Sequence, residues 1–147
     1  NQLIEKVDNV TPQIILQLTN EELRACYFTR QKISYVKHLA HEIEGGHLNL
    51  KKLQKLEDAE IKLQLKKIKG IGDWTAEVFM MMALQKCNYF PVGDVALVTS
   101  TKDILNLSKE TTKQEIEIIS QKWQPYKTLA AFMIWWSYIN KRNITWQ

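Results

Sequence analysis

Glycine and proline are scarce in this sequence, and their scarcity limits the fold more than any other feature. The 147 residues contain five glycines and three prolines, so long stretches of chain are free to be helical. Leucine, lysine, glutamine and glutamate are frequent in these stretches, and all four favour helices. We therefore expect an all-α fold, a bundle of several helices that forms a single domain over residues 1–147.

Helix starts are marked by side chains that can accept a hydrogen bond from the N–H groups of a first turn. The starts expected on this ground are at Thr11, Thr19, Thr29, Asp73, Asp94 and either Thr111 or Thr112. A short helix is also expected at residues 49–56 and a longer one at residues 58–68. The helix that begins at Asp73 should reach about Lys86, and the most apolar and aromatic helix should follow Pro125.

A glycine-rich turn, Lys69-Gly70-Ile71-Gly72, separates two of these helices and predicts a hairpin at residues 66–74. Unpaired N–H groups at such a turn, together with the dipole of the next helix, attract an anion. The alternative is that the glycines only end one helix and relieve strain before the next. We favour DNA phosphate binding, through Lys69, Gly70, Ile71, Gly72 and Asp73.

Charge and cysteine content exclude little on their own. The net charge of +4 suits a polyanionic partner but is too small to decide the function. Cys26 and Cys87 lack a Cys-x-x-Cys spacing, so they predict neither a zinc site nor an iron–sulfur cluster, and the three histidines match no metal-binding spacing. The longest apolar run, residues 129–139, is too short to span a bilayer. We expect an intracellular monomer that needs no cofactor and no membrane.

The hairpin belongs to a longer pattern, which reads Leu65-x-x-Ile68-x-Gly70-Ile71-Gly72-x-Trp74-Thr75-Ala76 and is followed by Phe90-Pro91-Val92-Gly93-Asp94. This pattern resembles the helix-hairpin-helix (HhH-GPD) DNA glycosylase superfamily, in which a Gly/Pro-rich loop and an aspartate follow the hairpin. Two later segments, Lys122-Trp123-x-Pro125-Tyr126-Lys127 and Ala130-Ala131-x-x-Ile134-Trp135, are similar to 3-methyladenine DNA glycosylases of the AlkA and yeast MAG type. The resemblance spans most of residues 29–140.

The resemblance implies base-excision repair of double-stranded DNA, with hydrolysis of the N-glycosidic bond of alkylated purines. It gives the catalytic role to Asp94, at the end of the loop 88–94. A fixed carboxylate there would stabilise the positive charge that develops on the deoxyribose. The alternative is that Asp94 is only a helix N-cap, and the two roles can coexist. Relatives that also cut the strand carry a lysine where this chain has Trp74, so the resemblance implies a monofunctional enzyme that leaves an abasic site.

The resemblance also assigns aromatic residues and a cation site. Trp74 and Trp135 match base-pocket positions, where indole rings stack on a flipped base and attract the charge of an alkylated purine. Val78 and Val95 stand where relatives carry further aromatic residues. The family's hairpin often binds a monovalent cation through backbone carbonyls, but the proposed reaction requires no metal. The carbonyls implied here belong to Lys66, Ile68 and Ile71.

Four other tryptophan and tyrosine residues of the last helix region are expected in the core, because such side chains at helical spacing are more often buried than functional. These residues are Trp123, Tyr126, Trp136 and Tyr138.

Two other functions remain open. The first is a non-catalytic helix-hairpin-helix DNA-binding module, although such modules usually carry paired hairpins and need no aspartate loop. The second is a helical domain that binds a protein partner through its aromatic last helix. Family members also have a helical segment ahead of the region that matches Asn1, with the wedge that fills the hole left by the flipped base. We expect this chain to lack that segment.

Overall fold

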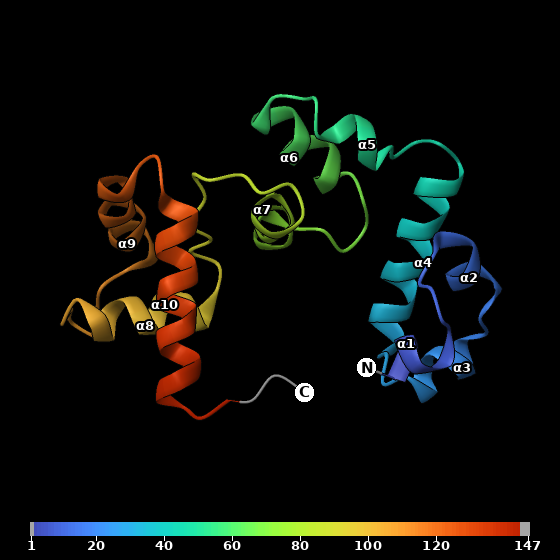
Figure 1. Cartoon of the computed structure of the whole chain (residues 1–147), viewed down its shortest axis with the longest axis horizontal. Helices are drawn as coiled ribbons and strands as arrows, with labels where there is room; N and C mark the ends of the chain where they lie inside the picture. Colours follow the sequence, from blue (N-terminus) through green and yellow to red (C-terminus); the bar gives the residue numbers. More distant parts are fainter. Residues whose placement is uncertain (1, 145–147) are drawn as a thin grey trace. The chain divides into compact units, whose positions relative to one another are not determined.

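The computed structural model describes residues 2–144, and these residues form helices, turns and loops without a strand (Figure 1). The expected all-α class is therefore confirmed. Within the described part of the chain, no helix is both long and apolar enough to cross a membrane. The chain divides into two compact units, residues 1–71 and 72–147, and the division falls between Ile71 and Gly72 of the predicted hairpin.

The first unit is built around one long amphipathic helix. Its elements are α1 (Gln2–Lys6), α2 (Pro12–Gln17), α3 (Asn20–Ala25), α4 (Arg30–Glu44), α5 (Leu50–Leu53) and α6 (Asp58–Lys66). Helices α2 and α3 pack against α4, and Leu23, Ile33 and Ala40 are buried among them. The threonines expected to cap α2, α3 and α4 do so, each through its hydroxyl, and α3 has the full capping box.

The second unit places two helices against each other around a separate core. Its elements are α7 (Asp73–Met82), α8 (Val95–Ile104), α9 (Lys113–Ser120), the 3-10 turn η1 (Gln121–Trp123) and α10 (Lys127–Lys141). Helix α8 packs against α10, and Leu97, Ile116 and Ala131 are fully buried between elements of this unit. The loop between α7 and α8 contributes Phe90 and Pro91 to the buried residues.

Some helix boundaries differ from those expected. Gly72, and not Asp73, occupies the N-cap position of α7, and Asp73 is the first helical residue. Helix α7 ends at Met82, before Lys86, because Gln85 has a positive φ of 54° and the Lys86 N–H turns back to the Met80 carbonyl. The last helix begins at Lys127, after Pro125 as expected.

The expected core positions of Tyr126 and Trp136 are wrong, because their side chains are 66% and 69% exposed. Trp136 lies on the face of α10 opposite the buried Ala131 and Ile134, since successive helical residues are separated by about 100°. Trp123 packs against the core. Both Trp123 and Tyr138 are half-buried.

The N-cap of α9 gives a test of local stability. Thr112 accepts the N–H of Glu115, and the Glu115 carboxylate accepts the N–H and the hydroxyl of Thr112. We expect Thr112→Ala to lower the free energy of unfolding by about 1 kcal/mol, a few degrees in Tm, whereas the neighbouring Thr111→Ala change should have little effect. Thermal unfolding followed by circular dichroism measures both.

The same cap should weaken in acid. The Thr112 N–H, and then its hydroxyl, lower the pKa of the Glu115 carboxyl in the folded state. A lowered folded-state pKa gives stability that is present at neutral pH and is lost as the pH falls through that pKa. The difference between the wild type and Thr112→Ala should therefore shrink in the acid range. A difference that grows with acidity would contradict the ionised capping box.

Candidate active site

Asp94 is fixed where the loop after α7 meets α8. Its N–H donates to the Pro91 carbonyl over 2.9 Å, which closes a turn at the end of the loop. Its Oδ1 accepts the Leu97 N–H at 2.7 Å, so Asp94 caps α8 as the sequence predicts. The side chain is half-buried. The carboxylate therefore has one well-defined position, and its helix-capping bond uses only part of its capacity to accept hydrogen bonds.

The two tryptophans predicted for the base pocket both reach this carboxylate. The Trp74 indole N–H donates to Oδ2 of Asp94, and the Trp135 indole N–H donates to Oδ1, each over 3.2 Å. Trp74 comes from the first turn of α7, and Trp135 comes from the middle of α10. Three N–H donors from three elements thus hold one carboxylate, and the three predicted site residues meet at one point.

Gly93 allows Trp74 to come this close. A Cβ at this position would lie 3.1 Å from the Trp74 Cβ, tighter than most real contacts between side chains. Trp74 would have to move to accommodate any other residue. The glycine that precedes the predicted catalytic residue therefore serves the packing of its tryptophan neighbour.

Asp94 lies in the wall of an apolar cleft of about 570 Å³, a volume typical of small-ligand sites. Trp74 and Trp135 line the same cleft, and Trp74 is 47% exposed, so one indole is accessible to a ligand. Val78 also lines the cleft, whereas Val95 is 72% exposed and is not among the lining residues. The cleft offers one carboxylate among mostly apolar and aromatic walls.

Sequence reasoning missed part of this cleft. Three further aromatic side chains of α10 line it, namely Phe132, Trp136 and Tyr138. Phe132 packs on Trp135 with ring centroids 5.8 Å apart, and the Arg142 guanidinium lies 4.0 Å from the centre of the Tyr138 ring. The spacing of these residues along one helix was a signal, but it fits a core face equally well until the buried side of α10 is known.

The hairpin residues have the local geometry of a tight turn. Gly70 has a φ of +91°, and the Ile71 N–H donates to the Ile68 carbonyl over 3.0 Å. The Tyr35 ring lies so close to Gly70 that a Cβ there would collide with it. A Cβ on Gly72 would meet no atom within 4 Å. Packing therefore requires a glycine at position 70, whereas at position 72 the backbone is open to a ligand.

The other predicted phosphate-binding residues flank this turn. Lys69 and Asp73 are exposed, and Ile71 is half-buried. Within residues 2–144, no three His, Cys, Asp or Glu side chains are placed to hold a metal ion.

Comparison with known proteins decides the family. The family model described as "HhH-GPD superfamily base excision DNA repair protein" matches residues 1–125. The chain belongs to this superfamily. The resemblance identified from the hairpin and the aspartate loop is thus confirmed.

The known proteins that this chain resembles include several 3-methyladenine DNA glycosylases. A DNA-3-methyladenine glycosylase of Bacillus subtilis is 35% identical over 121 residues, which are 82% of this chain and 40% of that protein. The 3-methyladenine DNA glycosylase Mag1 of Schizosaccharomyces pombe, solved in complex with abasic DNA, superposes with a TM-score of 0.79 at 30% identity, over 85% of this chain and 61% of that one. A DNA-3-methyladenine glycosidase of Bacillus halodurans gives 0.75 at 29% identity, over 92% and 63%. This HhH-GPD chain therefore spans about two fifths to three fifths of these relatives.

Proposed function

We propose that this HhH-GPD chain carries the active site of a monofunctional DNA glycosylase that removes alkylated purines, of the 3-methyladenine type, from double-stranded DNA. The observation that carries the proposal is the Asp94 carboxylate, held by the indole N–H groups of Trp74 and Trp135 in the wall of an aromatic cleft. The named 3-methyladenine glycosylases among its relatives support the same substrate class. We place the protein inside the cell, where it would act as a monomer on DNA.

The proposed chemistry follows from the cleft. As the bond between the deoxyribose C1′ and the base nitrogen breaks, positive charge develops on the sugar, and the Asp94 carboxylate stabilises that charge. Water adds to C1′ and loses a proton, while the base leaves with the electrons of the broken bond. A purine that carries an alkyl group is already cationic, so it is a good leaving group and is attracted to electron-rich indole faces.

The aromatic walls of the cleft would bind the damaged base by stacking. An enzyme of this kind must take the base out of the duplex and stack it between flat side chains. Trp74, half-exposed in the cleft, supplies one such face. Because position 74 holds an indole instead of an amine, no Schiff base with the sugar can form there, and the product is an abasic site on an intact strand.

The hairpin would hold the DNA backbone beside the damaged site. Lys66, Lys67 and Lys69 are exposed, and the glycine backbone and the first N–H groups of α7 follow them in the sequence; each of these features suits a phosphate. Lys66 is the last residue of α6, and Ile68 and Ile71 lie in the turn after it; their carbonyls are oxygen ligands of the type that hard cations prefer. We propose that a monovalent cation there would neutralise charge between the hairpin and the phosphate.

Base release from methylated DNA tests the function. The full-length protein is incubated with methylated duplex DNA, and free bases are measured by chromatography. We expect release of 3-methyladenine, with strand breaks that appear only after alkaline treatment. DNA binding that depends on salt but gives no base release would favour the non-catalytic module. Breaks that form without alkali would contradict the monofunctional assignment.

Trp135→Phe separates the stacking role of this ring from its hydrogen bond. Phenylalanine keeps an aromatic wall beside Phe132 but cannot donate to Oδ1 of Asp94. We expect the single-turnover rate of base release to fall about tenfold, because the carboxylate loses one of its three donors. Trp123→Phe is the control, because this indole packs on Phe90 in the core and is not among the residues that line the cleft. An equal loss in both variants would show that the hydrogen bond has no special role.

A further inference from the structure

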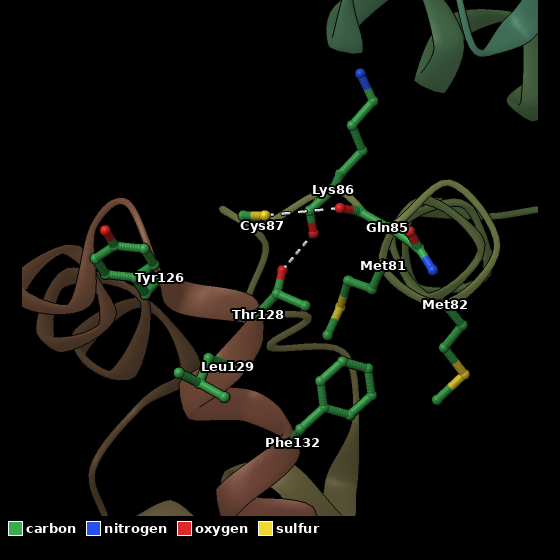
Figure 2. Close-up of a pocket in the computed structure, with 9 residues that line it drawn as sticks. All are labelled: Met81, Met82, Gln85, Lys86, Cys87, Tyr126, Thr128, Leu129 and Phe132. Carbon is green, nitrogen blue, oxygen red and sulfur yellow. Dashed lines mark hydrogen bonds between the residues drawn. The ribbon is translucent and has the colours of Figure 1, made fainter.

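A buried threonine at the start of α10 binds the loop that leads to Asp94. Thr128 is 7% exposed, and its Oγ1 donates to the Lys86 carbonyl over 2.7 Å, a bond drawn in Figure 2. The same oxygen accepts the Tyr89 N–H at 3.1 Å and lies 3.4 Å from the Tyr89 carbonyl. The Thr128 N–H donates to the Cys87 carbonyl over 2.8 Å. One residue thus binds three residues of the loop.

These bonds replace an ordinary helix cap. Helix α10 has Tyr126 at its N-cap position, and no side chain there accepts a hydrogen bond from the first turn. N–H groups at the start of a helix lack partners within the helix. The Cys87 carbonyl supplies one for Thr128. The loop and the helix therefore satisfy each other's backbone groups, which makes the loop position depend on α10.

The other end of the loop is attached to the same helix. After Tyr89, the loop buries Phe90 and Pro91 in the core and turns into Asp94. Trp135 follows Thr128 by about two turns of α10 and donates to the Asp94 carboxylate. The loop is thus bound to α10 at its start through Thr128 and at its end through Trp135. A shift at the first attachment would move the carboxylate relative to the indole.

We infer that Thr128 is a positioning residue for Asp94: its hydroxyl fixes the loop so that the carboxylate stays in register with Trp135 and the cleft. The inference rests on the proposed catalytic role of Asp94. A misplacement of a reacting group by about 1 Å can cost roughly a hundredfold in rate. In the proposed function, intact DNA is held by the hairpin, which Thr128 does not contact. Loss of the hydroxyl should therefore lower the rate of the chemical step and leave DNA affinity unchanged.

Thr128→Val and Thr128→Ser test this in the full-length protein. Valine keeps the shape and the backbone N–H but removes the hydroxyl, whereas serine keeps the hydroxyl and removes only a methyl group. We expect the single-turnover rate on methylated DNA to fall roughly 10- to 100-fold in the valine variant and less than about threefold in the serine variant. DNA affinity should change by less than about twofold in either.

A spectroscopic measurement reads the position of Asp94 without relying on activity. The indole N–H resonance of Trp135, observed by nitrogen-15 NMR, reports its hydrogen bond to the carboxylate. We expect this resonance to move in Thr128→Val towards its position in Asp94→Ala, and to stay in place in Thr128→Ser. If the protein releases no base at all, the proposed function fails, but this measurement still decides whether Thr128 positions the carboxylate.

Thr101→Val is the matched control. Thr101 is fully buried in the same unit, and its hydroxyl donates to the Leu97 carbonyl within α8, so the same change removes a bond that involves no loop residue. We expect a normal rate and an unchanged Trp135 resonance. The inference is overturned if Thr128→Val keeps the wild-type rate and resonance. It is also overturned if Thr128→Ser or Thr101→Val loses as much as Thr128→Val.

Discussion

Replacement of Asp94 by asparagine is expected to reduce base release by at least about a hundredfold without unfolding the protein. Loss of one preorganised charged group commonly costs this much in rate, because the charge on the sugar is then no longer stabilised. The fold should tolerate the change, since asparagine is as good an N-cap as aspartate and its amide oxygen can still accept the Leu97 N–H. The single-turnover rate on methylated duplex DNA measures the effect.

The variant is informative because it separates the two roles of Asp94. Asparagine keeps the cap but places an NH₂ group where Oδ2 accepts the Trp74 indole N–H, so that bond is lost together with the charge. Asp103→Asn makes the same change of charge at an exposed position of α8 and should leave the rate unchanged. A fully active Asp94→Asn enzyme would show that Asp94 is only a cap, and another carboxylate would have to be sought.

Much of the fold could be predicted from short-range signals. The caps at Thr11, Thr19 and Thr29 depend on residues within one turn of each other, so their side chains identify them without tertiary information. The choice between Thr111 and Thr112 could not be made in this way, because both can accept a hydrogen bond. The structure selects Thr112, since only this register lets Glu115 complete the capping box.

The parts of the site that could not be predicted depend on distant residues. The hydrogen bonds from Trp74 and Trp135 to Asp94 join residues 20 and 41 positions apart, and the resemblance assigned all three residues without indicating that they touch. The contacts of Thr128 with the loop span a similar distance in sequence. The exposed side of α10 was misjudged for Trp136, because a helix rich in aromatic residues has no clear polar face to mark its outside.

Gly70→Ala should weaken the binding of undamaged duplex DNA by roughly 10- to 100-fold, the loss expected when charge-assisted hydrogen bonds to a phosphate are broken. Alanine is strained at a φ of +91°, and its Cβ would collide with the Tyr35 ring. The atoms that this Cβ would meet are Cγ, Cδ1 and Cδ2 at the base of the ring, and these cannot move away as the far end of a flexible side chain could. The hairpin must therefore change its conformation. Fluorescence anisotropy with labelled DNA measures the affinity, and circular dichroism checks the helices.

Gly72→Ala makes the same chemical change two residues later and distinguishes a distorted turn from an obstructed phosphate site. Gly72 has an ordinary φ of −95°, and a Cβ there meets no protein atom within 4 Å, so the fold and Tm should not change. A methyl group on open backbone would still keep a phosphate from the N–H groups at the start of α7, so affinity should fall at every salt concentration. Lys69→Gln should instead lower the slope of log affinity against log salt concentration by about one, the amount that corresponds to one lost phosphate contact. Unchanged affinity in Gly72→Ala would mean that DNA does not approach the hairpin at this glycine.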